Sequence, residues 1–410
     1  MTDLIEGHRP IEPPAGVPVL DVDPYAEDVL TNPAPFYADL RAAGPFAYIP
    51  KYSVLACGRH AEVSEVFSDW ERFTSARGVG LQDFALQEPW RPPSKVLEVD
   101  PPYHTRTRRV LTRALSPRAV ADLREMFRGE AETLIDRLLD SGDFDGVADF
   151  AEAFPPTVFP RAVGLDESDA RKLIDYGAMV FNALGPDNTI RGAAMAKGPE
   201  IVPWINRRCL RENLSPNGFG ATIYAAADAG DITEDEAAML VRSLLSAGVD
   251  TTVTALGSAL WCLAAHPHEF EKLKADPSLA RSAFEETMRF TSPVAAFCRT
   301  ASGDTTVSGV DLKEGTKIIC VLGSANLDPD HWPDAGRLDI TRKTMGHLAL
   351  GIGIHNCVGQ NVARAEGEAV MKALAERVDR IELTGPAIWR PNNAIHALDR
   401  LPIRCSRIAS

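Results

Sequence analysis

One cysteine stands inside a glycine-rich run, LGIGIHNCVG at residues 350–359. This cysteine is Cys357, and a stretch with helical character follows it at residues 362–366. A thiolate in this place would receive backbone N–H groups and face the positive end of a helix dipole, and both favour the anion. The glycines let the backbone come close to a flat ligand. These properties suit an axial thiolate ligand to haem iron, although an isolated match of this length is more often an ordinary buried cysteine.

Three other segments carry charged or hydroxyl groups at spacings that can support chemistry. One helix is predicted over residues 233–265, from the capping box TEDE at residues 233–236 to the stop signal His266-Pro267, and it would be about 45–50 Å long. Its middle, AGVDTT at residues 247–252, places small and β-branched residues among good helix formers, which weakens the helix locally.

The other two segments are defined by helical spacing. Glu286 and Arg289 are three residues apart, and His104 and Arg108 are four apart in a helix predicted to begin after two prolines at residues 101–102. Cations in a fixed geometry are what ligand carboxylates need. Each spacing alone is common on helix surfaces, so only the four segments together indicate a function.

Together these four segments, which span residues 100–359, resemble the cytochrome P-450 superfamily. The chain is identified as a member of the soluble bacterial branch, which implies the P-450 fold. By this resemblance Cys357 ligates the iron of haem b, and His104, Arg108, Arg299 and His355 bind the haem propionates. A thiolate ligand favours O–O cleavage. One departure is visible, because Leu350 stands where the family usually has Phe, and we expect a change in redox tuning but not in ligation.

The resemblance also assigns roles in proton delivery and in holding the cysteine loop. Asp250 and Thr251 become the catalytic acid and alcohol that deliver protons to iron-bound dioxygen. The alternative for Asp250 is a salt bridge at a bend in the helix. By the same resemblance, Glu286, Arg289 and Arg337 form an ion cluster beneath the cysteine loop. Its role would be structural, because loss of one partner leaves a buried charge without its counter-charge.

Polar groups in the expected pocket suggest an anchor for a small carboxylate. Ser243, Ala247 and Thr251 recur every four residues on one helix face, and Ser243 would lie roughly 12 Å from Thr251 along the axis. Arg242 is adjacent to Ser243, and an earlier loop offers Arg91 and Ser94. Between such an anchor and the iron there is room for about one benzene ring. The alternative is that the serines bond to backbone and Arg242 faces solvent.

Aromatic side chains are available to clamp such a ring. Phe181 and Phe297 are candidates for stacking or edge contacts, with Val294 beside them. With the anchor residues, they resemble the P-450 subfamily that oxidises para-substituted benzoates, above all by O-demethylating 4-methoxybenzoate. Leu184 stands where a second aromatic is expected after Phe181, which widens the pocket.

The elements that must position these residues are mostly helical. Amphipathic patterns run from residue 117 to about 280, and strand patterns appear near residues 48–54, 299–307 and 317–321. Without internal repeats or low-complexity linkers, this indicates one α+β domain over residues 1–410. In it, a long central helix lies over haem and small sheets lie at the periphery.

Composition excludes several other classes of protein. The 410 residues are 45% hydrophobic, enough for a large core, and no run of 18 apolar residues or signal peptide at residues 1–10 is visible. We therefore expect a soluble cytoplasmic protein with no membrane partner. Seven scattered cysteines without a CxxC pair predict neither a disulfide framework nor a zinc site. A net charge of −14 argues against nucleic acid as a partner.

No flavin or nicotinamide fingerprint is present, so electrons for O2 must come from a separate protein. The resemblance implies an iron–sulfur ferredoxin and an NADH-dependent ferredoxin reductase. An acidic ferredoxin would dock on a basic patch near the haem motifs, formed by Arg108, Arg109, Arg113, Lys343 and Arg364. Three alternatives remain: a P-450 for another small hydrophobic substrate such as a terpenoid or fatty acid, a haem-thiolate peroxygenase, which the intact Asp250-Thr251 pair disfavours, and a non-enzymatic haem sensor.

Overall fold

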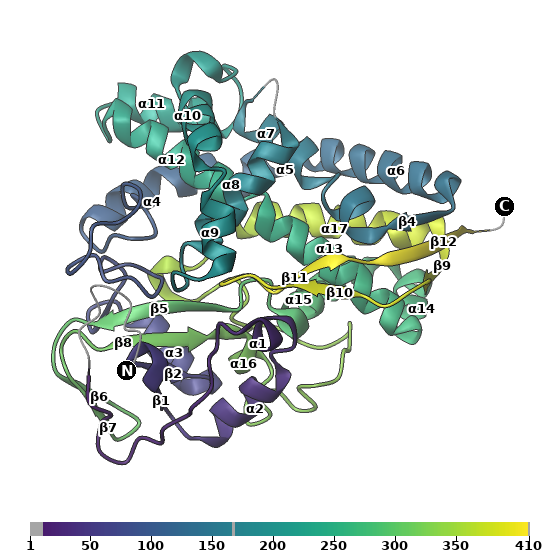
Figure 1. The fold of residues 1–410 in the computed structure, drawn as a ribbon. Coiled ribbons are helices and arrows are strands. Elements are labelled where there is room, and N and C mark those ends of the chain that lie inside the picture. The colour runs from purple at the N-terminus through teal and green to yellow at the C-terminus, as the bar shows by residue number, and fades with distance from the viewer. Residues whose placement is uncertain (1–10, 166–168, 409–410) are drawn as a thin grey trace.

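Many of the helices lie above the largest sheet in the view of Figure 1, and short helices such as α2 (Ala34–Ala42), α3 (His60–Ser68) and α16 (Leu322–Asn326) surround that sheet. The computed structural model describes residues 11–165 and 169–408, so the polar start at residues 1–10 lies outside the described residues. The helices are α1 (Glu27–Thr31), α2 (Ala34–Ala42), α3 (His60–Ser68), α4 (Tyr103–Ala114), α5 (Pro117–Ala121), α6 (Arg124–Ser141), α7 (Pro155–Val163), α8 (Ala170–Asn182), α9 (Thr189–Met195), α10 (Gly198–Arg208), α11 (Phe219–Asp228), α12 (Glu234–Ala247), α13 (Asp250–Ala265), α14 (Pro267–Ala275), α15 (Ala280–Thr291), α16 (Leu322–Asn326) and α17 (Gln360–Arg377). The strands are β1 (Ala47–Ile49), β2 (Val54–Cys57), β3 (Phe73–Thr74), β4 (Asp143–Asp145), β5 (Ala296–Ala301), β6 (Thr305–Val307), β7 (Val310–Leu312), β8 (Lys317–Val321), β9 (Val378–Leu383), β10 (Ile388–Arg390), β11 (Ala397–Arg400) and β12 (Pro402–Arg407).

The predicted strand zones are confirmed, and all of them except β6, which pairs with β7 in a separate hairpin, contribute to one sheet. Its order is β1-β2-β8-β5-β3, with β2 and β8 parallel and the other neighbours antiparallel. Every residue of β2 and β8 is buried, which fits the apolar sequence VLAC and, apart from Lys317, the sequence KIICV. Smaller sheets pair β4, β12 and β9, and β10 with β11. The mostly helical α+β fold with small peripheral sheets is therefore confirmed.

The prediction of one continuous helix over residues 233–265 is wrong in its middle. The capping box at Thr233 and the end at His266 are confirmed, but α12 stops at Ala247 and α13 starts at Asp250. A Cβ on Gly248 would lie 2.2 Å from the ring of Phe159, so only glycine lets α7 pack this closely. The hydroxyl of Thr251 donates to the Ala247 carbonyl at 2.6 Å and thereby competes for the helix's own acceptors.

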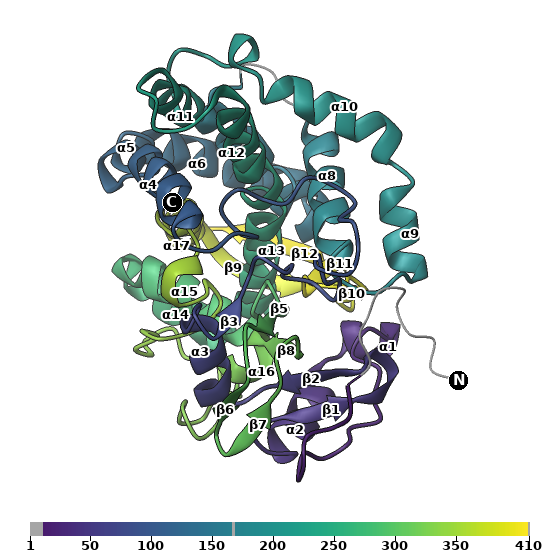
Figure 2. The ribbon, with the colours of Figure 1, turned by 90° about the vertical axis from the view of Figure 1, so that its left-hand side faces the viewer.

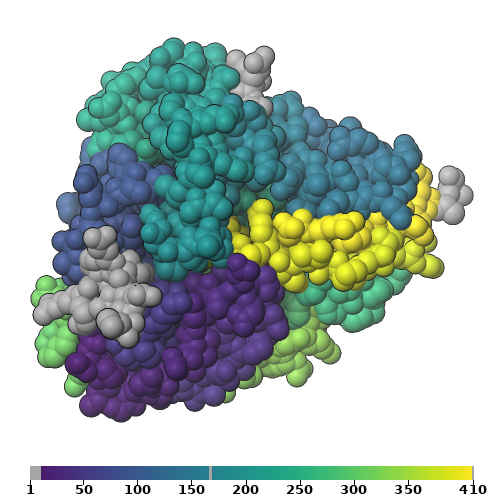
Figure 3. All heavy atoms as spheres, in the orientation of Figure 1, coloured from purple at the N-terminus to yellow at the C-terminus, as the bar shows by residue number. Residues whose placement is uncertain are grey.

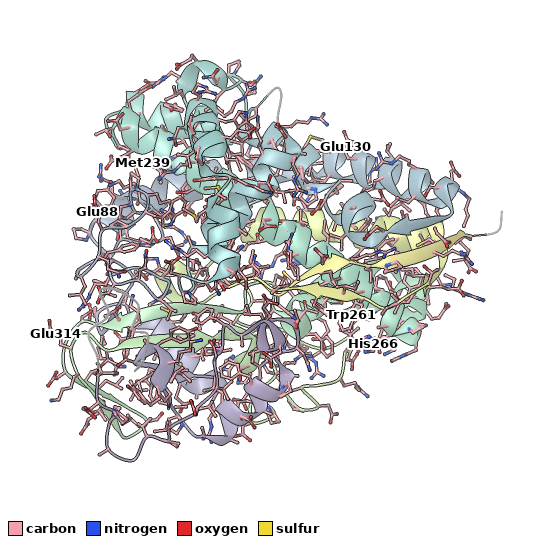
Figure 4. The ribbon with its side chains drawn as sticks, viewed as in Figure 1. Glu88, Glu130, Met239, Trp261, His266 and Glu314 are labelled. Atoms are coloured by element: carbon pink, nitrogen blue, oxygen red, sulfur yellow. The ribbon has the colours of Figure 1, made fainter. Side chains whose placement is uncertain are left out.

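Together α12 and α13 cross the molecule. Figure 2 shows α13 at the centre, with α12 above it. In Figure 4, Met239 on α12 and Trp261 on α13 mark positions far apart along this path. Almost every residue of α13 is buried in the main hydrophobic core. Such a position suits the helix to carry groups that must be held rigidly.

The C-terminal segment closes one face of the protein. On the face drawn in Figure 3, the C-terminal residues (yellow) separate the N-terminal segment (purple) from a block of helices (blue). In the same region α17 packs against α6 and α15. Within residues 11–165 and 169–408, no helix is both long enough and apolar enough to cross a membrane.

Candidate active site

Cys357 lies between a short 3-10 turn (Gly353–His355) and α17. Its backbone N–H donates to the Leu350 carbonyl at 2.8 Å, which closes the loop. Gly351 and Gly353 have φ values of +66° and +72°, and a Cβ on Gly353 would meet Ser68 Cα at 2.8 Å. The loop therefore requires glycine at these positions both for its turn and for its close packing on α3.

The sulfur of Cys357 is held in surroundings with opposing effects on its charge. Burial raises the pKa of the Cys357 thiol, while the Gly359 N–H, Arg108 and Arg364 act to lower it. The start of α17 follows directly and adds its dipole. A metal ion bound at the sulfur would supply the positive charge that favours the thiolate outright.

The four residues predicted to bind propionates come together beside this loop. The rings of His104 on α4 and His355 have their centroids 4.4 Å apart. Arg108 donates to the Asn356 carbonyl at 2.6 Å and also bonds to the Asn356 side chain. Burial lowers the pKa of His355, and Arg299 on β5 lies close enough to act in the same direction. Three distant segments thus concentrate four cationic or basic groups in one place.

Two of these groups, His104 and Arg299, form no ion pair with a carboxylate among the described residues. The buried Nε2 of His104 has no hydrogen-bond partner among the described residues. Burial, followed by His355 and Arg108, lowers the pKa of His104 to about 4. Arg299 is buried, donates to the Cys298 carbonyl at 2.9 Å and lies over the ring of Phe67, and no ion pair is formed by it within the described ranges. A buried guanidinium and an unpartnered histidine fit the two carboxylates of haem.

Sequence reasoning gave no role to Asp100, which organises this cluster. Its carboxylate lies 3.4 Å from His355 Nε2 and accepts hydrogen bonds from the Thr74 hydroxyl and the Ser75 N–H. Burial would raise the pKa of Asp100, but these bonds hold it below its ordinary value. The available signal was its position one helical turn before His104, whose N–H donates to the Asp100 carbonyl.

The predicted acid and alcohol lie at the break between α12 and α13. Asp250 is fully buried, neither carboxylate oxygen has a hydrogen-bond partner in the described structure, and Arg390 Nη2 is 3.9 Å away. Burial raises the pKa of Asp250 to about 6, and Arg390 acts in the opposite direction. Gly177 on α8 makes room, because a Cβ there would lie 2.6 Å from Asp250 Cβ. The salt bridge at a bend that was the alternative for Asp250 is thus present, and the pKa of its carboxyl group is well above the ordinary value.

Two of the three residues predicted to form an ion cluster, Glu286 and Arg289, form a buried ion pair, and the third, Arg337, does not join them. Arg289 Nε and Nη2 lie 2.7 and 2.8 Å from the two oxygens of Glu286, and both side chains are fully buried. Arg337 is not part of the cluster, since its side chain is 65% exposed and pairs with Asp339. Arg342 takes its place, with Nε 3.1 Å from Glu286 Oε1. The prediction failed because both arginines lie in an irregular segment, where spacing does not indicate which one faces inward.

The proposed serine pair is present in the structure. The hydroxyl oxygens of Ser94 and Ser243 lie 3.3 Å apart, and either can donate. Each is also bonded to nearby backbone, Ser243 to the Met239 carbonyl and Ser94 to the Leu97 N–H, so the alternative of backbone bonding holds as well. Ala247, one turn further on, is exposed. The pair therefore joins the loop near residue 94 to the face of α12 that leads to Ala247.

The two arginines beside the serines are engaged with the same loop. Arg91 Nη1 lies 3.0 Å from Glu98 Oε2, and Arg242 Nη2 donates to the Pro92 carbonyl at 3.3 Å. Arg91 therefore has a partner that the sequence reasoning did not foresee. Arg242 is only partly buried and pairs with no carboxylate in the described ranges, so it is the less compensated charge of the two.

The aromatic and aliphatic candidates form one small hydrophobic cluster. Phe181 is buried with Ala394, Ile395 and Ala397, and Leu184, Val294 and Phe297 pack against them. Phe181, Leu184 and Phe297 therefore lie together, as predicted from the sequence. Sequence reasoning gave no individual role to Ile395, which forms a bridge with Val294.

Known proteins are similar to this chain in both sequence and fold. The cytochrome P450 family model matches residues 207–379. Cytochrome P450 CYP199A2 of Rhodopseudomonas palustris is 50% identical over 402 residues, which cover 98% of each chain. The chain belongs to the cytochrome P450 family. The P450 monooxygenase PikC of Streptomyces venezuelae is 32% identical over 96% of each chain. The structure of CYP109Q5 from Chondromyces apiculatus matches with a TM-score of 0.79 and 28% identity, over 95% of this chain and 99% of that one.

Membership in the family defines the class of reaction. The protein is a cytochrome P450 monooxygenase, an oxidoreductase with a haem iron cofactor that uses O2 and electrons from redox partners. The unpartnered His104 and the buried Arg299, next to a cysteine in a glycine loop, fit that cofactor.

Proposed function

We propose that residues 1–410 act as one cytochrome P450 domain that inserts one oxygen atom from O2 into a small aromatic carboxylate. The reaction is O-demethylation or hydroxylation at the para position of benzoates such as 4-methoxybenzoate. The observation that carries this proposal is the pair of hydroxyl groups of Ser94 and Ser243, 3.3 Å apart. On binding, these two hydroxyl groups turn from their present acceptors and donate to the two oxygens of one carboxylate, and Arg242 adds positive charge at the next position of the helix.

In this proposal the chain would hold haem b through a cysteine and four basic side chains. Cys357 ligates the iron, and His104, Arg108, Arg299 and His355 hold the propionates. When bound, the haem supplies the redox chemistry that activates oxygen. The protein contributes a fixed and largely buried set of basic side chains, because all four groups lie on α4, β5 or the cysteine loop, and Asp100 orients His355.

Asp250 and Thr251 then transfer protons beside the substrate. A carboxyl group with a pKa of about 6 both gains and loses protons near neutral pH, which suits a general acid. Arg390 lies against Asp250 and is 29% exposed, so it connects this buried group with the surface. The hydroxyl of Thr251 is the next group along the chain and can pass the proton toward the substrate.

The anchor also fixes the orientation of the ring. Ser243 precedes Thr251 by eight residues, and Phe181 and Phe297 lie in a separate apolar cluster. A benzoate held by its carboxylate presents its para substituent at the opposite end. We therefore expect 4-methoxybenzoate to bind, to shift the spin state of the iron and to be demethylated, whereas the 2-methoxy isomer is not.

The experiment is a binding titration followed through the spin state. Hydrogen bonds to a charged group contribute about 1.5–3 kcal/mol, so Ser243→Ala should weaken 4-methoxybenzoate binding by roughly tenfold or more. The matched control is Ser246→Ala, whose hydroxyl donates to the Ser243 carbonyl on the same helix. Neutral 4-methoxytoluene should bind much more weakly than the acid, because it leaves polar groups unpaired. Equal binding of acid and neutral analogue would exclude the benzoate proposal, in favour of another small hydrophobic substrate.

We propose an iron–sulfur ferredoxin, reduced by an NADH-dependent reductase, as the electron donor. A shallow surface hollow of about 530 Å³ is lined by His104, Thr105, Arg108, Arg109, Thr112, Arg113 and Ile354, directly beside the cysteine loop. Of the expected basic patch, Arg113 pairs with Asp231 and Arg364 with Glu285. Arg109 and Lys343 are exposed and form no ion pair in the described structure, so they are the charges most available to an acidic partner.

A further inference from the structure

The side-chain ammonium of Lys317 on β8 is buried among four backbone carbonyl groups of one loop. Its Nζ donates to the carbonyl oxygens of Arg77 at 3.1 Å, Gly78 at 3.2 Å, Gly80 at 3.2 Å and Gln82 at 2.6 Å. We call residues 77–82 the carbonyl loop. An ammonium has three N–H donors, so at least one of them is shared between two acceptors. The lysine thus behaves as a cation surrounded by carbonyl dipoles.

No carboxylate replaces these carbonyls as the partner of Lys317. The nearby Asp83 is bound by Arg77, whose Nε donates to it at 2.9 Å and whose Nη2 forms a second bond. Lys317 is 3% exposed and forms no ion pair in the part of the chain that the structure describes. A buried charge is costly unless polar groups surround it, and four carbonyl oxygens that converge on one point are costly without a cation. Each partner therefore requires the other.

The carbonyl loop is bonded directly to the walls of the proposed pocket. The Val79 carbonyl accepts from the Cys298 N–H at 2.7 Å, and the Leu81 N–H donates to the Leu184 carbonyl at 2.8 Å. Leu184, and Phe297 next to Cys298, pack on Phe181. At Gly80 a Cβ would lie 2.5 Å from the Leu184 carbonyl oxygen, so the loop and the end of α8 are in close contact. A shift of this loop would move two residues that line the pocket.

We propose that Lys317 is a positioning residue that serves as a built-in monovalent cation, holding the carbonyl loop closed and thereby setting the width of the substrate pocket. The pocket in question is that of the proposed function. Rings of carbonyls also coordinate potassium in place of its hydration shell. A loop deprived of the lysine ammonium should therefore accept potassium or ammonium ions from solution.

The test uses the holoenzyme of Lys317→Met, with Lys313→Met as the matched control. Lys313 is 78% exposed and pairs with Asp304 away from the carbonyl loop. Hydrogen exchange of the Leu81 and Cys298 amides is measured in potassium, ammonium or choline chloride at one ionic strength. We expect exchange at least about tenfold faster in Lys317→Met with choline, and restored in a saturable way by potassium or ammonium. The affinity for 4-methoxybenzoate should fall by about tenfold and recover with the same ions.

Two results with Lys317→Met would overturn the proposal. Parent-like exchange in Lys317→Met with choline would show that the ammonium does not hold the loop. Faster exchange that neither potassium nor ammonium returns to the parent rate would show that the lysine only fills space.

If Lys317→Met does not fold, Gly80→Ala is the second variant. It keeps the lysine and presses on Leu184, so it should speed Leu81 exchange and weaken substrate binding. Parent-like values in Gly80→Ala would disprove the link between loop and pocket. The exchange measurement needs no substrate, so a parent enzyme that fails to bind benzoate refutes the proposed function alone.

Discussion

Replacing Arg342 by alanine should destabilise the protein far more than replacing Arg337. Arg342 donates to Glu286, which is fully buried, and also to the carbonyl groups of Pro333, Asp334 and Arg337. These bonds connect α15 to the irregular segment that leads toward the cysteine loop.

The loss of unfolding free energy depends on which buried groups each substitution leaves unpaired. Breaking a buried ion pair costs about 3–5 kcal/mol. We expect Arg342→Ala near the lower end, about 3 kcal/mol, because Arg289 still neutralises Glu286. Arg289→Ala belongs at the upper end, because it removes both of the arginine's bonds to Glu286 and the bonds to the Asn326 and Ala335 carbonyls. Arg337→Ala loses only an exposed pair, which is worth about 0.2–1 kcal/mol.

The assay is urea unfolding of the ferric holoenzyme, followed by far-ultraviolet circular dichroism and by haem absorbance. Haem is kept saturating, since a ligand that binds the folded state shifts its apparent stability. The three variants should rank Arg289, Arg342, Arg337 in order of decreasing loss. A loss for Arg337→Ala as large as that for Arg342→Ala would refute the reasoning.

Three further predictions concern protons and electrons. Because burial raises the pKa of Asp250 to about 6, the stability from its neutral form is present below its ordinary pKa and is lost as the pH rises through about 6. Asp250→Asn should therefore gain unfolding free energy relative to the parent between about pH 4 and pH 7, and a difference independent of pH would contradict this assignment. Thr251→Ala should bind haem and substrate but form more hydrogen peroxide and less product per NADH, and an unchanged product yield would exclude its proton role. Arg109→Glu should slow reduction by the ferredoxin and flatten its decrease with salt, whereas parent-like rates at every ionic strength would move the docking site elsewhere.

Local patterns predicted those parts of the site that depend on neighbours in sequence. The glycines around Cys357, the Glu286–Arg289 spacing and the His104–Arg108 turn each bring groups together within one element, and all of them appear in the structure as expected. The capping box at Thr233 was equally local. Periodicity within a helix is thus sufficient to predict a contact when one helix supplies both residues.

Contacts between distant segments were not predictable in the same way. Arg390 reaches Asp250 from a hairpin that follows it by many residues, and no spacing rule connects the two. The break at Gly248 depends on the ring of Phe159, which belongs to a different helix. The sequence showed that the helix was weak there, but only tertiary packing decided that it would stop.

The parallel pairing of β2 with β8 has a consequence for how the chain is made. Leu55 pairs with Ile318, so the first strands leave the ribosome long before their partner exists. Until then β2, whose residues are all buried in the final protein, presents an unpaired apolar edge. Contacts between such distant residues slow folding and prolong the exposure of that edge to aggregation. The yield of folded protein should therefore depend on what protects the N-terminal strands while the remaining chain is synthesised.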